Sequence, residues 1–450
     1  MERKPIYTWQ YNRRSMQDSI LAMNPWWEDG AVPPAVLGRP RPGYVDSMEK
    51  GLRSAGTVIV TGPRRTGKTT LVRQLIQRRL DQGAPAKRCL YLQLDHPSMP
   101  RENPILASVK AFRTEMAIPR REKLHLFLDE VQHSPDWARE VKALADLEPG
   151  FQMVATGSSA SVVEPDAMRH LAGRQTKLRV WPMGFREFLE FGGKRTPLSE
   201  DYLHSALLKD YLVTGGFPRA AVEEEASLRQ DYLVELFEDI LFKDVASVHG
   251  VKDTARLRDL AFLLASGSGS PASVNKLSRL TGLALDTTRE YISHLQSSYL
   301  FHGASFYSRS VNETTYNPKK YYLVDPGMSA ALSGRERAGA LAETALFEQF
   351  RRAGGGVYYW KSGPELDFFL PGRKLAVECK FKDSIAEEDV RGMVAFLSKY
   401  GLKQGLVATA GAEGEIGVSG KRIRLVPLWR LLLEPEGPGR RPAGPRGDVS

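Results

Sequence analysis

The stretch that decides the fold is Gly62-Pro63-Arg64-Arg65-Thr66-Gly67-Lys68-Thr69. Before it, Val58-Ile59-Val60 is a β-branched run of the kind that forms a buried parallel strand. After it, apolar side chains recur at helical spacing between Leu71 and Leu80. The stretch and its flanks therefore predict a strand, a glycine-rich turn and a helix, in the order of a phosphate-binding P-loop.

The residue types of this turn suit a nucleoside triphosphate. Glycines let the backbone curl until several N–H groups face one point, and the N-terminus of the following helix adds partial positive charge there. Lys68 is expected to reach the β- and γ-phosphates, and the Thr69 hydroxyl to bind Mg²⁺. The residues predicted to bind ATP in this turn are Gly62, Pro63, Arg64, Arg65, Thr66, Gly67, Lys68, Thr69 and Thr70.

A second motif lies downstream, where an apolar run beginning at Leu124 ends in Asp129 and Glu130. This is a Walker-B pattern. Asp129 is predicted to hold the metal ion, and Glu130 to act as the base that polarises the attacking water. The alternative is a strand end that carries two solvated acids.

Strands and helices alternate from Gly51 to about Arg179, which predicts a parallel sheet covered by helices. The P-loop, Asp129 and Ser158 each follow a predicted strand, so we expect them at the edge formed by the carboxyl ends of the strands. Ser158 is predicted to contact the γ-phosphate or the attacking water. A local turn or a helix cap is the alternative for this serine.

Arg174 precedes the last strand of this region and is a candidate arginine finger. It would stabilise charge on the γ-phosphate from its own subunit or from a neighbouring one. The second case implies a homo-oligomer. The alternative is a structural or surface arginine.

The composition bounds the class of protein. The chain has 450 residues, 42% of them hydrophobic and 26% charged, which is ordinary for a globular protein of several domains. No apolar run approaches the length of a membrane helix, and the N-terminus leads into no signal core, so we expect a cytoplasmic protein without a membrane partner. The net charge of +10 favours nucleic acid modestly over a merely solvated basic surface. Cys89 and Cys379 are expected to stay reduced.

Several further segments follow the P-loop and Walker-B motifs in a fixed order: Thr156-Gly157-Ser158-Ser159, Leu171-Ala172-Gly173-Arg174, Trp181-Pro182-Met183-Gly184-Phe185 and Gly215-Gly216-Phe217-Pro218. On these residues the chain resembles a group of prokaryotic AAA-type ATPases that carry a C-terminal domain of unknown function. The resemblance covers about residues 50 to 415. It implies the strand order 5-1-4-3-2 and a small helical lid, in which Arg219 would be a sensor.

After the lid, Ser273 to Leu285 reads as a helix and a short glycine turn, and a second helix follows. This is the helix-turn-helix pattern, with Thr287, Thr288 and Arg289 expected to begin the recognition helix. Residues 301 to 324 are predicted to form a β-hairpin, which would be a wing. Such a module binds DNA or docks a protein, and the sequence leaves both open.

The last region contains a second group of charged residues. Asp367 lies on one predicted strand, and Glu378 and Lys380 lie two residues apart on the next, so the latter two share a face. Carboxylates so placed bind Mg²⁺ through hard oxygen ligands. Glu378 and Lys380 also interrupt an apolar strand, where unpaired charges are costly.

This pattern is similar to the PD-(D/E)XK nuclease superfamily in motif and in its α-β-β-β-α-β order. The resemblance implies metal ligation by Glu343, Asp367 and Glu378, and catalysis of phosphodiester cleavage by Glu378 and Lys380. The Pro364-Glu365 pair matches the first part of the motif only loosely. Alternating charges on a half-exposed strand are the other interpretation.

The predicted fold is thus an α/β P-loop core followed by smaller modules. The predicted domains are an arm (1–50), the ATPase core (51–200), a helical lid (201–264), a winged helix (265–335), a nuclease-like domain (336–430) and a disordered tail (431–450). The predicted function is Mg²⁺-dependent ATP hydrolysis, with DNA bound or processed by the C-terminal domains. The alternative is a signalling or remodelling ATPase whose inactive nuclease-like domain docks a protein.

Overall fold

The computed structural model divides the chain into two compact units, one ending at Trp181 and the other beginning at Pro182. It describes residues 18–120, 122–148, 151–163, 169, 171, 173–194, 200–333 and 338–433. The start of the predicted arm and the predicted tail beyond residue 433 lie outside these ranges. None of the helices within them combines the length and the apolar character that a bilayer-spanning segment requires.

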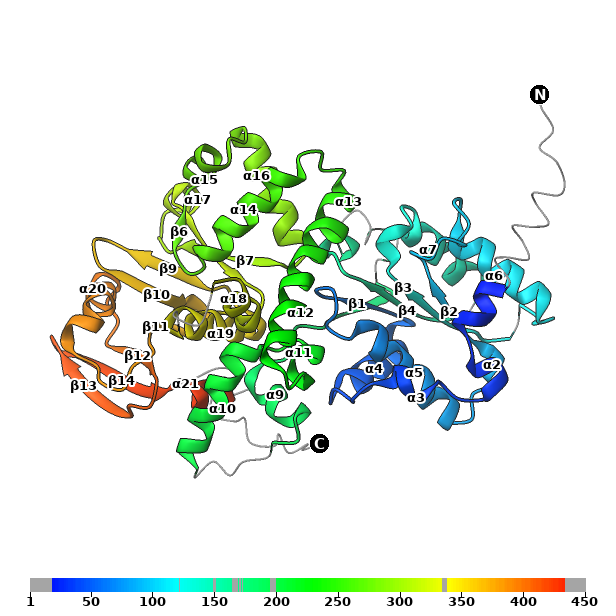
Figure 1. The fold of residues 1–450 in the computed structure, drawn as a ribbon, viewed down its shortest axis with the longest axis horizontal. Coiled ribbons are helices and arrows are strands. Elements are labelled where there is room, and N and C mark those ends of the chain that lie inside the picture. The colour runs from blue at the N-terminus through cyan, green and yellow to red at the C-terminus, as the bar shows by residue number, and fades with distance from the viewer. Residues whose placement is uncertain are drawn as a thin grey trace, which may run out of the picture. The chain divides into compact units, whose positions relative to one another are not determined.

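The first unit is built on a five-stranded parallel sheet (Figure 1). The strands lie in the order β2-β3-β4-β1-β5, which is the order that the family resemblance implied. Their bounds are β1 Thr57–Thr61, β2 Cys89–Gln93, β3 His125–Asp129, β4 Gln152–Gly157 and β5 Gln175–Arg179. Because all strands are parallel, their carboxyl ends meet at one edge, where the P-loop and the Walker-B acids were expected.

Helices connect and cover these strands. α4 (Tyr44–Ala55) packs on β1, β4 and β5, and α5 (Lys68–Asp81) follows the P-loop and buries Leu71, Leu75 and Ile76. The other α-helices that the structure describes in this unit include α2 Trp26–Asp29, α3 Pro34–Leu37, α6 Pro104–Glu115 and α7 Trp137–Leu147. The buried faces of these helices and the strands form one hydrophobic core.

The N-terminal arm covers the free edge of β2. The Asn24 side chain pairs with the backbone of Tyr91 as a neighbouring strand would, since Nδ2 donates to the carbonyl at 2.9 Å and Oδ1 accepts from the N–H at 2.7 Å. The indole N–H groups of Trp26 and Trp27 both donate to the carbonyl of Cys89 at 3.0 Å. These bonds satisfy an otherwise open strand edge, so these arm aromatics serve the core.

The second unit contains a nine-stranded mixed sheet in the order β13-β14-β12-β11-β10-β9-β7-β8-β6. The bounds are β6 Pro271–Ala272, β7 Phe301–Phe306, β8 Lys319–Leu323, β9 Tyr358–Lys361, β10 Glu365–Leu370, β11 Leu375–Lys380, β12 Gln404–Thr409, β13 Gly414–Val418 and β14 Lys421–Pro427. β7 pairs in parallel with β9, with Phe306 opposite Tyr359. The strands expected in the winged helix and those expected in the nuclease-like region therefore share one sheet.

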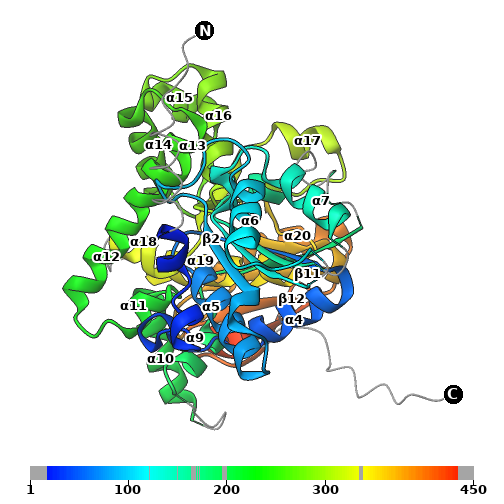
Figure 2. The same ribbon diagram turned by 90° about the vertical axis from the view of Figure 1, so that its right-hand side faces the viewer.

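The helices of this unit include α9 Phe185–Phe191, α10 Asp201–Thr214, α11 Pro218–Val222, α12 Ala226–Asp239, α13 Ser247–His249, α14 Thr254–Ser266, α15 Val274–Thr281, α16 Leu285–Ser297, α17 Val311–Tyr316, α18 Pro326–Ser333, α19 Ala338–Ala353, α20 Arg391–Tyr400 and α21 Leu428–Leu433. A π-helical stretch, Ile240–Ala246, connects α12 to α13, so the three segments form one continuous helix (Figure 1). Helices α14, α15 and α16 gather together in both views (Figures 1 and 2).

The region predicted as a winged helix differs from expectation in two details. Thr288, expected to begin the recognition helix, is buried, and its hydroxyl donates to the carbonyl of Ala284 at 2.9 Å. Arg289 is exposed and pairs with Asp286 at 2.8 Å. β7 and β8 are antiparallel as a hairpin would be, but α17 lies between them, because residues 311–316 form a capped helical turn that begins after Ser310.

The Gly215-Gly216 turn is explained by close backbone approach in the second unit. The Asp325 carboxylate accepts from the N–H of Gly216 at 2.6 Å and from the N–H of Met328 at 3.0 Å, which ties this turn to the start of α18. The carbonyl of Gly216 accepts from the N–H of Met183 at 2.7 Å. A Cβ on Gly216 would lie 2.0 Å from the carbonyl oxygen of Met183, so only glycine fits.

We predict that Gly216→Ala lowers the free energy of unfolding by about 1–3 kcal/mol, because the backbone must move to admit the methyl group. Gly339→Ala is the matched control, since a Cβ there meets nothing within 4 Å and the residue lies in α19. In a helix that substitution stabilises by roughly 0.5–1 kcal/mol. Chemical denaturation of the two variants measures the difference, and equal effects would contradict the close-approach explanation.

Candidate functional site

The P-loop has the backbone conformation that its glycines predict. Gly62 and Gly67 both have positive φ angles, of 150° and 94°, and Arg65 has a φ angle of 63°. A Cβ on Gly62 would lie 2.0 Å from the carbonyl oxygen of Val180, so this position admits only glycine. α5 begins at Lys68, which directs the N-terminus of that helix at the loop.

Lys68 lies folded into its own loop. Its Nζ donates to the carbonyl oxygens of Gly62 at 3.0 Å and Pro63 at 2.9 Å, and the side chain is buried. Thr66 also donates its hydroxyl to the Pro63 carbonyl, at 3.0 Å. The loop thus holds a cation beside the helix N-terminus, where phosphate oxygens are favoured.

Asp129 is the centre of the site. It lies at the end of β3, 2% exposed, and three hydroxyl groups donate to its carboxylate. Thr69 and Tyr91 each donate to Oδ2 at 2.7 Å, and Thr156 donates to Oδ1. The predicted Mg²⁺ residues Thr69 and Asp129 are therefore in direct contact. Their oxygens are hard ligands of the kind that Mg²⁺ prefers.

Glu130 follows in a left-handed conformation, with a φ angle of 56°. Its backbone N–H donates to the Thr156 hydroxyl at 3.2 Å. Its side chain accepts from Nε2 of Gln132, and the same Nε2 lies 2.9 Å from the Ser158 hydroxyl. Gln132 therefore bridges the predicted base and the serine predicted to meet the γ-phosphate.

The pKa values of Asp129 and Glu130 are shifted in opposite directions. Burial and the neighbouring Glu130 raise the pKa of Asp129 above its ordinary value, although the three hydroxyl donors oppose this. Burial alone would also raise the pKa of Glu130, but Lys68, Gln132 and Arg64 outweigh it and lower the pKa. Glu130 is thus favoured as a carboxylate, the form that a general base requires.

Sequence reasoning missed Tyr91 and Gln132, and it favoured Ser158 over Thr156 in the segment at the end of the fourth strand. In the sequence, Thr156 stands out only as part of the segment that contains Ser158. Gln132 stands out only as the residue two positions after Glu130. Tyr91 carries no local signal, because its hydroxyl reaches Asp129 only once β2 and β3 are paired.

Arg174 lies away from this group in the same chain. It precedes β5, whose first residue pairs with Thr57 and whose last residue pairs with Thr61. Arg174 is therefore at the amino end of the sheet, where it forms an ion pair with Asp146. A finger role in its own subunit does not fit this position, whereas a role toward a neighbouring subunit stays a prediction.

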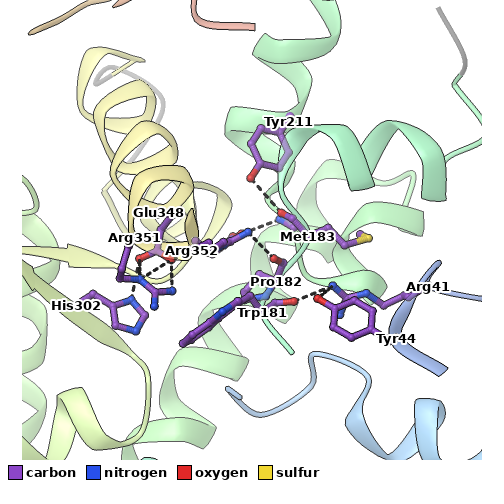
Figure 3. Close-up of polar contacts among 12 residues, drawn as sticks. Arg41, Tyr44, Trp181, Pro182, Met183, Tyr211, His302, Glu348, Arg351 and Arg352 are labelled. Atoms are coloured by element: carbon purple, nitrogen blue, oxygen red, sulfur yellow. Dashed lines mark hydrogen bonds and ion pairs between the residues drawn. The ribbon is translucent and has the colours of Figure 1, made fainter. Parts of the chain in front are cut away.

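The chain leaves the first unit alongside the P-loop. The N–H of Val180 donates to the carbonyl of Thr61 at 2.7 Å. Arg41 donates through Nη1 to the carbonyl of Thr66 at 2.6 Å. Its Nη2 donates to the carbonyl of Trp181 at 2.9 Å (Figure 3). One buried arginine thus joins the P-loop backbone to the last residue of the unit.

Hydrogen bonds within the second unit hold its first residues, Pro182 and Met183, in place. Arg352 donates to the carbonyl of Pro182 at 2.8 Å, and the Tyr211 hydroxyl donates to the carbonyl of Met183 at 3.1 Å (Figure 3). Buried Glu348 lies 3.6 Å from Arg352 and accepts from Arg351 at 2.6 Å. Burial would raise the pKa of Glu348, but the neighbouring Arg351 and His302 outweigh it and lower the pKa well below its usual range.

The second predicted group, in the C-terminal region, also comes together, but around a lysine. Lys320 of β8 is 1% exposed. Its Nζ lies 3.3 Å from Oε1 of Glu343, 2.7 Å from Oε1 of Glu365 and 3.5 Å from Oδ1 of Asp367. Sequence reasoning did not include Lys320 in this group, and it named Glu365 only as part of a loose match to the motif. In the part of the chain that the structure describes, no three acidic, histidine or cysteine side chains are placed to hold a metal ion.

Glu378 and Lys380 share a face of β11 as predicted from the strand period. Lys380 donates to Oε1 of Glu378 at 2.6 Å, and the N–H of Cys379 donates to Oδ2 of Asp367 at 2.9 Å. Burial and the nearby Asp367 raise the pKa of Glu378 well above its ordinary value, and the same two causes raise the pKa of Glu343 to about 7. Phosphodiester cleavage by these residues stays a prediction.

Comparison with known families divides the chain into three matches. Residues 54–189 match the family model of the AAA domain. Residues 205–338 match a domain of unknown function, DUF8612, and residues 338–431 match another, DUF4143. The P-loop, Asp129 and Glu130 therefore lie within the part of the chain that matches the AAA domain, and two parts that match domains of unknown function follow it.

Relatives are similar over most of the chain. A protein of Haemophilus influenzae, named as uncharacterized, is 27% identical over 321 residues, which cover 69% of this chain and 78% of the relative. A protein of Methanocaldococcus jannaschii, also named as uncharacterized, is 24% identical over 401 residues, 83% of this chain and 88% of the relative.

Among solved structures, a Walker-type ATPase of Pyrococcus abyssi is 12% identical, with a TM-score of 0.42, covering 65% of this chain and 95% of its own. The Aeropyrum pernix ORC1 protein, in complex with DNA, is 16% identical, with a TM-score of 0.36, covering 67% of this chain and 94% of its own. At these scores, neither likeness gives an argument about what this chain binds.

We predict that Thr156→Val lowers the free energy of unfolding by about 1–3 kcal/mol, because it leaves the buried Asp129 carboxylate without one of its three hydroxyl donors. Thr156→Ser keeps the hydroxyl and serves as the control. Urea denaturation of protein without nucleotide measures both variants. A Thr156→Val protein as stable as Thr156→Ser would contradict the central place of this hydrogen bond.

Proposed function

We propose that the first unit binds ATP with Mg²⁺ and hydrolyses it. The observation that carries this proposal is the direct contact between Thr69 of the P-loop and Asp129 of β3, with Glu130 next in the chain. These residues come from two segments 60 positions apart and meet at the carboxyl edge of a parallel sheet. The AAA-domain match over residues 54–189 supports the same assignment.

Each residue has a distinct part in this proposal. The P-loop N–H groups and Lys68 bind the β- and γ-phosphates, and the Thr69 and Asp129 oxygens hold the metal. When bound, Mg²⁺ neutralises charge that develops on the phosphate oxygens. Glu130 accepts a proton from the water that attacks the γ-phosphorus, which requires the carboxylate form that its lowered pKa favours.

Gln132 is the positioning residue of this arrangement. Because Nε2 of Gln132 contacts both Glu130 and Ser158, the orientation of the base depends on the side chain beyond β4. A γ-phosphate would accept from the Ser158 hydroxyl, whose oxygen also accepts from this amide. Ser158 and Gln132 would then report the presence of the γ-phosphate to Glu130.

Arg41 links the P-loop to the last residue of the first unit. It holds the carbonyls of Thr66 and Trp181 together, and Trp181 is followed directly by the second unit. We propose that a change in the P-loop on binding or hydrolysis alters the Arg41 contact with Trp181. The protein would thus work as a nucleotide-driven switch that acts on the domains after Pro182.

We predict that Glu130→Gln lowers steady-state ATP turnover by about 10²–10⁴-fold, because glutamine cannot accept the proton, while ATP binding persists. Lys68→Ala should lose turnover with its fold retained. Phosphate release and equilibrium nucleotide binding measure the two properties separately.

Glu122→Gln is the matched control for the change of charge, since Glu122 pairs with Arg88 on a partly exposed surface. Its turnover should equal that of the unaltered protein. Turnover that survives in both Glu130→Gln and Lys68→Ala would refute the assignment.

DNA is the partner that we propose for the second unit. A groove of 440 Å³ lies between α15, α16 and α17, lined by polar and apolar residues that include Asn275, Arg289, Ile292 and Lys319. Exposed Tyr316 borders it and offers an aromatic face. The net charge of the chain supports the same partner.

Duplex and single-stranded DNA added to the turnover assay distinguish this partner from a protein. Stimulation of turnover by DNA, weakened in Arg289→Ala, supports DNA. Turnover indifferent to DNA favours the alternative of a signalling or remodelling ATPase that docks a protein. Discrete rings whose turnover needs Arg174 would favour the remodelling case and a homo-oligomer.

A further inference from the structure

The carboxylate cluster of the second unit is built around Lys320. Three carboxylates surround its ammonium group within 3.5 Å: Glu343 from α19, and Glu365 and Asp367 from β10. Lys320 itself comes from β8, which is not adjacent to β10 in the sheet. The lysine therefore joins acids from two elements that are not its neighbours in the sheet.

The carboxylates are also held from other sides. The Tyr322 hydroxyl donates to Oε1 of Glu343 at 2.7 Å, and Lys361 lies 3.1 Å from Oε2 of Glu365. The backbone N–H of Cys379 donates to Oδ2 of Asp367. The acids are thus oriented toward Lys320 by hydrogen bonds and ion pairs that do not require any further group.

An ammonium group in this position competes with a divalent cation. Mg²⁺ needs close to six oxygen ligands at about 2.1 Å in octahedral geometry. Here one oxygen of each of the three acids already lies within 3.5 Å of a positive charge. A second cation among the same oxygens would be repelled by the first, and the repulsion is strong where water is excluded.

We propose that Lys320 is the resident cation of this cluster, and that its ammonium group takes the place that a metal ion would occupy. Glu343, Glu365 and Asp367 then neutralise a lysine instead of binding Mg²⁺. The residues present do not fit a metal-dependent nuclease centre, and the cluster stabilises the sheet by joining β8, β10 and α19. This inference is independent of ATP hydrolysis in the first unit.

Glu378 is the part of the cluster that keeps a free oxygen. Its Oε1 accepts from Lys380, but its Oε2 is buried and has no hydrogen-bond partner among the described residues. A cation that entered beside Asp367 would be near the Glu378 carboxylate, because the two residues lie on the paired strands β10 and β11. The test therefore has to show whether or not Asp367 and Glu378 hold a metal ion.

The experiment counts Mn²⁺ bound per chain, by electron paramagnetic resonance of the full-length protein without nucleotide. We expect Asp367→Asn and Glu378→Gln each to bind as much Mn²⁺ as the unaltered chain. Loss of one Mn²⁺ per chain in either variant would overturn the proposal, because a metal would then share the cluster with Lys320.

The second arm removes the lysine. Lys320→Met should gain about one Mn²⁺ per chain, since the acids become free to act as hard oxygen ligands. Lys320→Met with Asp367→Asn should return to the unaltered count. Lys403→Met, which removes an exposed lysine elsewhere in the second unit, is the control and should leave the Mn²⁺ count unchanged.

A folded Lys320→Met protein, checked by circular dichroism, that gains no Mn²⁺ would contradict the claim that the ammonium takes a metal's place. Removing one partner of a buried ion pair is destabilising by about 3–5 kcal/mol. If that variant does not fold, the comparison of the unaltered chain with Asp367→Asn and Glu378→Gln still decides the question.

Discussion

The carboxylate of Asp129 is the constraint on which the first unit depends. A buried charge without partners is costly, so hydroxyl groups must reach it from β2, β4 and α5. Thr69, Tyr91 and Thr156 do so, and together with β3 they fix four elements relative to one another. The donors are neutral and favour the ionised carboxylate, whereas burial and the neighbouring Glu130 raise the pKa of Asp129. The same arrangement that stabilises the sheet edge thus places the Asp129 oxygens beside the P-loop.

The second unit meets the same physical problem differently. Its buried acids Glu343, Glu365 and Asp367 surround Lys320, so their charge is compensated within the chain. Hydroxyl donors leave a site that still attracts a cation, whereas an ammonium partner removes that attraction. On the proposed account, Asp129 and Thr69 hold a metal ion, whereas the cluster around Lys320, which is built from similar residue types, is structural.

The sequence predicted the local features well and the long-range ones poorly. The P-loop, the strand that ends at Asp129 and the face shared by Glu378 and Lys380 follow from spacing and strand period, which are local. The strand order came from family resemblance. Tyr91 and Lys320 were missed, because their partners lie far away in the sequence and a tyrosine or lysine on a strand is ordinarily half exposed. The parallel pairing of β7 with β9 left no signal for the same reason.

The most direct test of the account is the effect of Mg²⁺ on ATP affinity. Equilibrium dissociation constants for ATP, measured with Mg²⁺ and with a chelator, would be compared between the unaltered chain and Asp129→Asn, which keeps the size of the side chain. We predict that Mg²⁺ strengthens binding by about tenfold or more in the unaltered chain, roughly 1.4 kcal/mol, and has little effect in the variant. An equal effect of Mg²⁺ on both proteins would show that Asp129 does not hold the metal, and would contradict the account.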